Sequence, residues 1–259
     1  MRQRRSAAQT LVGMVLGGLL LVGILAGCRT TSPWAGLDAE GIFEKGLAAF
    51  EDEDWGDAVE AFEIFTSRYP GHGRIAEGRM YLARSYFRRG EFISSAAEFE
   101  RFLQLHPSHG LAPEASLGIC RSYVELSPHP QRDQQYTERA RDACRQTRNE
   151  FQGMNVADEA EALRVQMVDR LAERTFMEAR FYQRRNAFDS AILIFQDLVD
   201  FYPETEWAPR GFLGLYESYR SIGWDEEAEQ VRDRLLFLYP ESEAAREVRQ
   251  RQAEQDDGV

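Results

Sequence analysis

The sequence predicts an all-α fold, an α-solenoid of about five helical hairpins, and the first observation behind it is the spacing of prolines. Four dipeptides each end a stretch with helical periodicity, and within each of the two pairs the prolines are 37 residues apart. These dipeptides are Tyr69-Pro70, His106-Pro107, Tyr202-Pro203 and Tyr239-Pro240. Proline cannot continue a helix and disfavours helical geometry in the residue before it, so each dipeptide marks the end of one hairpin. Stacked hairpins form curved surfaces that hold other chains, which favours binding over catalysis.

A second observation is that small and aromatic residues recur at fixed distances before each proline, in the pattern of tetratricopeptide repeats. Before Pro70, Gly46 and Ala58 take the small positions, while Phe62 and Phe65 take large ones. A third observation is that the turns within the hairpins share polar sequences with glycine or asparagine. These turns are Asp54-Trp55-Gly56-Asp57, Arg89-Gly90-Glu91-Phe92, Arg185-Asn186-Ala187-Phe188 and Ile222-Gly223-Trp224-Asp225. We assign the aromatic stripes to core packing.

Residues 1–27 have the features of an export signal. Arg2, Arg4 and Arg5 precede an apolar stretch from Leu11 to Leu25. The stretch runs into Leu25-Ala26-Gly27-Cys28, which resembles the lipobox of bacterial lipoproteins, where the cysteine becomes the lipid-bearing N-terminus. The alternative is an uncleaved membrane anchor, but the stretch is shorter than the roughly 20 residues that a spanning helix needs.

The residues after the signal predict the location of the protein. Arg29 stands where Asp is the usual inner-membrane retention signal in enteric bacteria, so we expect a lipid anchor in the cell outer membrane and a chain that faces the periplasm. Residues 28–38 are expected to form the lipidated tether. Loss of the three signal arginines lowers the net charge from −12 to about −15. This negative charge argues against nucleic acid as a partner. It also repels anionic lipid surfaces, so we expect the lipid anchor to supply the membrane affinity.

The repeat domain is expected at residues 39–243, and its centre departs from the regular period. The expected repeats are at about 40–70, 75–107, 113–152, 158–203 and 207–240. Between Pro107 and Pro203 lie too many residues for two regular periods, so the third repeat is degenerate, with a proline-containing insertion at Ser127 to Arg132. Asp158 to Arg185 contains no Gly or Pro and predicts one helix of about 28 residues, roughly 42 Å long.

The elongated first helix of the fourth repeat is expected to divide the chain into an N-terminal group of repeats and a C-terminal pair. Beyond the last repeat, residues 244–259 read as a charged C-terminal tail, because the segment from Arg246 on loses its apolar stripe. We expect its last residues to fray.

Lipidation would use Cys28 and leave Cys120 and Cys144, which fall on two consecutive predicted helices. The periplasm permits disulfides, so a Cys120–Cys144 bridge is one reading. The other is two small buried hydrophobic side chains, which is what free cysteines usually are in a helical core.

Four stretches of the repeat domain are more specific than a shared repeat. They are Glu100-Arg101-Phe102-Leu103-Gln104-Leu105-His106-Pro107-Ser108-His109; Arg132-Asp133-Gln134-Gln135 with Thr137 and Ala140; Arg170-Leu171-Ala172; and Ala179-Arg180-Phe181-Tyr182-Gln183-Arg184-Arg185. With the five repeats and the long fourth-repeat helix, they resemble the BamD family, the lipoproteins of the outer-membrane β-barrel assembly machinery. This resemblance spans about Gly41 to Ser242, and the lipobox agrees with it.

The resemblance implies a non-enzymatic scaffold that docks on the POTRA domains of BamA and, where they are present, on other Bam lipoproteins. It also implies that the protein helps to receive and insert unfolded outer-membrane β-barrel proteins. Two departures affect the docking region: the family usually has an acid where this chain has Thr175, and a basic residue near Ile194.

The first helix of each tetratricopeptide hairpin lines the concave face, at offsets of −6, −3, +1, +4 and +5 from its small residue. Apolar residues there suit an extended or helical segment with aromatic anchors, whereas arginines suit carboxylates. The resulting partner-binding candidates are Phe43, Phe50, Met80, Arg84, Phe87, Arg88, Phe176, Arg180, Arg184, Arg210 and Arg220. The alternatives are that the tether or a neighbouring helix covers Phe43 and Phe50, and that the arginines form a solvated, salt-bridged face.

No motif for catalysis, a metal, a cofactor or a small-molecule substrate is found. His106 and His109 are separated by the helix-breaking Pro107 and are expected to be turn residues. A different class of function is a repeat lipoprotein acting as a pilotin or envelope-maintenance adaptor in secretin assembly or peptidoglycan synthesis. A third is an inner-membrane-anchored periplasmic scaffold, if the signal is not cleaved.

Overall fold

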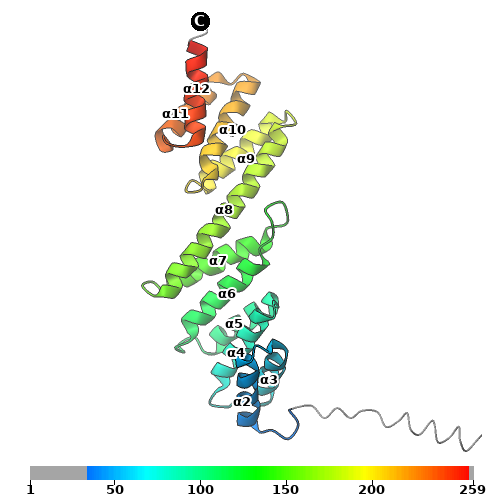
Figure 1. Ribbon diagram of the computed structural model, residues 1–259. Helices are drawn as coiled ribbons and strands as arrows, with labels where there is room; N and C mark the ends of the chain where they lie inside the picture. The colour runs from blue at the N-terminus through cyan, green and yellow to red at the C-terminus, as the bar shows by residue number, and fades with distance from the viewer. Residues whose placement is uncertain (1–33, 257–259) are drawn as a thin grey trace, which may run out of the picture.

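The computed structural model describes residues 34–256, so the predicted signal, the Cys28 lipidation site and most of the tether lie outside the described residues. Within them the chain forms eleven α-helices, ten of which pair into five hairpins. The hairpins are α2 (Ala39–Glu51) with α3 (Trp55–Arg68), α4 (Ile75–Arg88) with α5 (Phe92–Leu105), α6 (Ala112–Leu126) with α7 (Gln135–Glu150), α8 (Asn155–Gln183) with α9 (Phe188–Phe201), and α10 (Trp207–Ile222) with α11 (Asp225–Leu238); α12 (Glu243–Asp256) follows. This confirms the predicted all-α solenoid, which Figure 1 shows as a stack from α2 to α12. In the described part, no helix is long and apolar enough to cross a membrane.

Proline and turn residues set the helix ends where the sequence predicts them. Helices α3, α5, α9 and α11 end at a capping residue that directly precedes proline, and these caps are Tyr69, His106, Tyr202 and Tyr239. Within the first hairpin, the carboxylate of Asp54 accepts the backbone N–H of Asp57 at 3.2 Å and caps the start of α3. In the last hairpin, Gly223 ends α10 with φ +79°, a left-handed conformation that glycine adopts without a steric penalty.

Successive hairpins stack through close approaches between a glycine and a buried aromatic ring. Gly118 and Gly214 both lie eleven residues after an X-Pro dipeptide. A Cβ atom at Gly118 would lie 2.5 Å from the ring of Phe99, and one at Gly214 would lie 2.3 Å from the ring of Phe195. Any side chain at these positions would overlap the ring of the preceding hairpin, so glycine sets the spacing between hairpins.

The long helix α8 divides the hydrophobic core. It runs from Asn155 to Gln183, 29 residues, close to the predicted limits. Ala160, near its start, packs in the cluster of the third hairpin, whereas Ala172 and Ala179 pack in one cluster with α9 to α12. Figure 1 shows α8 reaching from α7 to the C-terminal hairpins. The interior is therefore built in separate clusters, and α8 contributes to two of them, that of the third hairpin and the C-terminal one.

The third hairpin has a thin core with polar and sulfur contacts. Its hydrophobic cluster consists of Leu117, Cys120, Cys144 and Ala160. A disulfide joins Cys120 of α6 to Cys144 of α7. Beside it, the buried hydroxyls of Ser116 and Thr147 share a hydrogen bond of 2.8 Å. These contacts hold α7 in place with few large apolar side chains.

The insertion between α6 and α7 is an ordered connector held by the long helix. The guanidinium of Arg170 donates to the carbonyl and hydroxyl of Ser127 at 3.0 and 2.9 Å, and that of Arg174 donates to the carbonyl of Arg132 at 2.9 Å. The buried Gln134 donates to two connector carbonyls and accepts from the hydroxyl of Thr137. The stretch around residues 132–137 thus has a structural role, because it satisfies the backbone of an irregular segment.

The C-terminal segment differs from its prediction as a charged tail without an apolar stripe. Residues 243–256 form α12, and Ala244, Ala245 and Val248 are buried in the C-terminal cluster. A guanidinium N–H of Arg251 donates to Glu217 of α10 at 2.9 Å. The prediction failed because this apolar stripe consists of only three small side chains, which bury well against the last hairpin even though the rest of the segment is charged.

Candidate binding grooves

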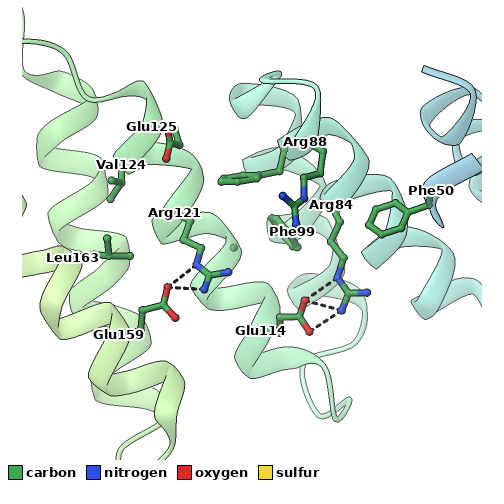
Figure 2. Close-up of a pocket in the computed structure, with 12 residues that line it drawn as sticks. Phe50, Arg84, Arg88, Phe99, Glu114, Arg121, Val124, Glu125, Glu159 and Leu163 are labelled. Atoms are coloured by element: carbon green, nitrogen blue, oxygen red, sulfur yellow. Dashed lines mark hydrogen bonds and ion pairs between the residues drawn. The ribbon is translucent and has the colours of Figure 1, made fainter. Parts of the chain in front are cut away.

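A hollow that runs along the first helices of the hairpins, here called the inner groove, has a volume of about 510 Å³. Its lining comes mainly from the C-terminal end of α2 and from α4, α6 and α8 (Figure 2). The apolar part of the wall consists of Phe50, Phe87, Phe99, Val124 and Leu163. Such a wall can bury apolar side chains of a bound segment.

The charges of the inner groove balance one another. Arg84 of α4 forms a bidentate pair with Glu114 of α6 at 2.8 and 2.7 Å. Arg121 of α6 donates to Glu159 of α8 at 2.7 Å, and Figure 2 shows the two ion pairs facing the same hollow. Arg88 has no acidic partner among the described residues and lies 5.8 Å from the ring of Trp55. With three arginines and three glutamates in the lining, the groove has no net charge.

Four of the predicted concave-face residues lie together in the inner groove. Phe50, Arg84, Phe87 and Arg88 all line it, and both phenylalanines are only partly buried. They take the +1, +4 and +5 offsets from the small residues of the first two hairpins. These offsets therefore select the side of the first helix that faces the groove.

The predictions for Phe43 and Met80 as surface residues are wrong. Both side chains are fully buried. Phe43 packs edge-to-face against Phe62 and Phe65 at centroid distances of 5.5 and 5.2 Å, and Met80 lies in the cluster of the second hairpin. Both lie three residues before the small residue of their hairpin. A side chain at this position points between the first helix and its neighbours instead of into the groove. Phe50, in contrast, is covered only in part, by Trp55 and Tyr81, whose rings both lie 5.2 Å from its own.

A second hollow, here called the α8 groove, contains three further predicted residues. Phe176, Arg180 and Arg184 line it, together with residues of the α6–α7 connector, and its volume is about 430 Å³. Phe176 again has the −3 offset and is partly covered, with its ring 5.3 Å from that of Trp207. Arg180 and Arg184 have the +1 and +5 offsets and face the groove.

The two candidates of the fifth hairpin line neither groove. Arg210 lies 3.7 Å from Glu206 and over the ring of Trp207 at 4.8 Å. Arg220 pairs with Asp225 at 3.0 Å. These two match the alternative of a solvated, salt-bridged face.

Sequence reasoning missed the third hairpin's contribution to the inner groove. Cys120 is its small residue, thirteen positions after Pro107, as Ala83 is thirteen positions after Pro70. From Cys120, the +1 and +4 offsets give Arg121 and Val124, which both line the groove. The offsets would have identified both residues, but positions were counted back from the proline that ends a repeat, and the degenerate repeat has no such proline.

The two candidate turn histidines lie in the turn between α5 and α6. The backbone N–H of His109 donates to the carbonyl of His106 at 3.1 Å, and Nδ1 of His109 accepts the N–H of Leu111 at 3.1 Å. Burial and then the charge of Arg79 lower the pKa of His106, so its imidazole is neutral at neutral pH. Across the described residues, no group of three His, Cys, Asp or Glu side chains is placed to hold a metal ion.

Stacked hairpins with a groove along their first helices define the class: this is a tetratricopeptide-repeat protein. A family model described as "Outer membrane lipoprotein" (YfiO) matches residues 36–235, and the chain belongs to this family. It is similar to two proteins named "Outer membrane protein assembly factor BamD". The relative from Rickettsia prowazekii is 24% identical over 88% of this chain and 92% of its own length, and that from Vibrio cholerae is 26% identical over 87% and 98%. The resemblance to the BamD family is thereby confirmed.

Two solved structures of tetratricopeptide-repeat proteins match the chain at low similarity. They include the TPR2AB domain of yeast Sti1, with TM-score 0.43 and 12% identity over 78% of either chain. Another is a tetratricopeptide repeat protein from Parabacteroides merdae, with TM-score 0.38 and 16% identity over 77% of this chain and 78% of that one.

Proposed function

We propose that this protein is a non-enzymatic scaffold of outer-membrane β-barrel assembly, anchored by lipid at Cys28 and facing the periplasm. It docks on BamA and helps to receive unfolded β-barrel proteins for insertion. Membership of an outer membrane lipoprotein family and the names of the two relatives support this proposal. The Cys120–Cys144 disulfide also supports it, because such bonds persist in the oxidising periplasm.

The inner groove is the observation that carries the proposal. Strands of outer-membrane barrels alternate apolar and polar side chains, so an unfolded segment presents both kinds. The groove offers aromatic and aliphatic side chains beside ion pairs that neutralise one another. Such a surface can bury the apolar side chains of an extended segment without repelling either sign of charge on it.

The C-terminal hairpins are the proposed docking region for BamA. They form one core with α12, which gives a partner a rigid surface. The two positions where the family usually has charges do not supply them here: the hydroxyl of Thr175 bonds to the carbonyl of Leu171 of its own helix, and Ile194 packs against the C-terminal cluster. Docking in this protein therefore uses other contacts than an ion pair at these positions.

Affinity capture from cell envelopes tests the docking role. The full-length protein, carrying an affinity tag, is isolated in mild detergent and its partners are identified by mass spectrometry. We expect a POTRA-containing β-barrel protein as the main partner. Recovery of only a secretin or a glycan synthase would contradict the proposal and favour the adaptor function. The mass of the N-terminal peptide tests the anchor, because cleavage and acylation at Cys28 exclude an uncleaved signal.

Substrate reception is tested at Phe87, whose half-buried ring lines the inner groove. Phe87→Asp puts a charge into the apolar wall and should weaken binding of a urea-unfolded β-barrel protein, measured by crosslinking, by about tenfold, a loss of about 1.4 kcal/mol. Leu193→Asp is the matched control, because Leu193 is an apolar side chain of α9 that is 65% exposed and lies outside the groove. Equal binding by both variants and the unchanged protein would refute the role of the inner groove.

A further inference from the structure

The α8 groove differs in charge from the inner groove, and we propose that it is a second, separate binding site for an acidic polypeptide segment that carries an apolar side chain. The proposal does not depend on the substrate role of the inner groove. The two hollows have different walls: the α8 groove lies between the C-terminal half of α8 and the α6–α7 connector. Its chemistry therefore selects a different partner.

The groove exists because the regular repeat is interrupted. Pro130 and Gln131 of the connector form one wall, and side chains of α8 form the other. The connector is fixed by hydrogen bonds from Arg170 and Arg174 to its backbone, so this wall is preformed. A preformed wall reduces the entropy that binding must overcome.

The lining has an excess of positive charge. Arg174, Arg180 and Arg184 face the groove, whereas Glu178 is the only acid in its lining. Arg180 lies 3.3 Å from Glu217, but the same carboxylate also accepts from Arg251 at 2.9 Å. Arg251 also pairs with Glu247, so these two arginines and two glutamates balance one another. The excess positive charge of the lining therefore comes from Arg174 and Arg184, against Glu178 alone.

Arg184 is the strongest anchor for a partner's carboxylate. It is exposed at the C-terminal cap of α8, and its side chain has no ion pair within the described residues. A planar guanidinium with free N–H donors binds a carboxylate in a bidentate fashion. The side chain of Arg174 uses one donor on a backbone carbonyl, which leaves its charge for a partner as well.

Apolar side chains lie between these charges. Phe176, Met177 and Phe181 belong to the lining, and Phe181 is 41% exposed, a large exposure for an aromatic ring. The guanidinium of Arg185 lies 3.8 Å from the centre of the Phe181 ring, which adds another positive charge next to the groove. A partner segment with an apolar side chain between carboxylates matches this alternation of apolar and positively charged side chains.

The rest of the protein excludes a longer polyanion. The chain has a net charge of −12, so the positive groove is a local exception on an acidic molecule. A nucleic acid would extend past the groove onto surfaces that repel it, whereas a short acidic peptide would not. Charge complementarity thus favours a polypeptide segment as the occupant.

The test uses a fluorescent peptide with alternating aspartate and phenylalanine residues and the full-length protein in detergent, with binding followed by fluorescence anisotropy. Arg184→Glu should weaken binding by about tenfold or more, because it replaces an attraction by a repulsion. Arg249→Glu is the matched control: it makes the same charge change at an exposed position of α12 outside the groove and should leave the affinity within about twofold. Arg184→Gln, which only removes the charge, should give an intermediate loss.

Peptide controls and folding controls complete the experiment. A peptide with asparagine in place of aspartate, or with serine in place of phenylalanine, should lose most of its affinity. Circular dichroism should show that Arg184→Glu keeps its helix content, since the side chain makes no internal ion pair. The proposal is overturned if Arg184→Glu and Arg249→Glu weaken binding equally, if the asparagine peptide binds as well as the aspartate peptide, or if only an oligonucleotide binds in an Arg184-dependent way. Phe87→Asp should leave this affinity unchanged; if it abolishes peptide binding, the two grooves are one site.

Discussion

Removal of the Cys120–Cys144 disulfide should destabilise the third hairpin more than any other part of the protein. The bond closes a loop between positions 24 residues apart. The chain-entropy relation gives roughly 3.5 kcal/mol for a loop of that length at room temperature. Both side chains are fully buried in a cluster whose other buried members are Leu117 and Ala160, with four more apolar side chains only partly buried around it, so little buried apolar packing compensates for the loss. The variant with alanine at both cysteines avoids burying new hydroxyl groups.

The assay is thermal unfolding by circular dichroism, with hydrogen exchange to locate the change. At roughly 2–4 °C per kcal/mol for a chain of this size, the alanine variant should melt about 7–14 °C lower. Because repeat arrays open in parts, exchange should accelerate first in α6 and α7. Reduction with dithiothreitol should move the unchanged protein toward the same midpoint and leave the variant unaffected. If reduction and substitution both leave the melting temperature and the exchange of α6 and α7 unchanged, the reasoning fails.

Two further predictions follow from packing and charge. Gly214→Ala should lower stability by about 1–3 kcal/mol in urea unfolding, because its Cβ would lie 2.3 Å from the Phe195 ring, whereas Gly71→Ala, with open space around it, should be nearly neutral. The hydrogen bond from Arg164, more than any other interaction, lowers the pKa of Glu161, so the carboxylate stabilises the fold above the ordinary glutamate pKa and this contribution disappears as the pH falls through the lowered value. Glu161→Gln should therefore unfold at lower urea concentration than the unchanged protein near neutral pH and at an equal concentration in strong acid; a constant difference at all pH values would contradict this.

The fold could be predicted because its signals are local. An X-Pro dipeptide ends a helix through the geometry of its own backbone, and the caps at Tyr69 and Tyr202 lie where the sequence places them. The absence of Gly and Pro similarly identified α8 to within three residues at either end. Helix ends of this kind need no knowledge of distant neighbours.

The binding surface could be predicted only in part, because it depends on how hairpins pack. The same offset rule predicted both Arg84 and Met80 for the concave face, but the structure places Arg84 in the inner groove and Met80 in the core. The two positions lie on the first helix of one hairpin, but only contacts with the next hairpin decide which of them is covered. Arg121 was missed because its repeat lacks the proline from which positions were counted.

The sequence by itself determined the ten helices of the five hairpins and their order, though not α12, since turn chemistry and side-chain periodicity act over a few residues. It also determined the family, through stretches such as residues 132–137. Only the tertiary structure decided which arginines meet an acid. Arg184, in the α8 groove, has no acid within reach, whereas Arg84 pairs with Glu114, which lies 30 residues further along the chain. Charge neutralisation and burial depend on contacts between hairpins, and these contacts are set by the stacking of the whole solenoid.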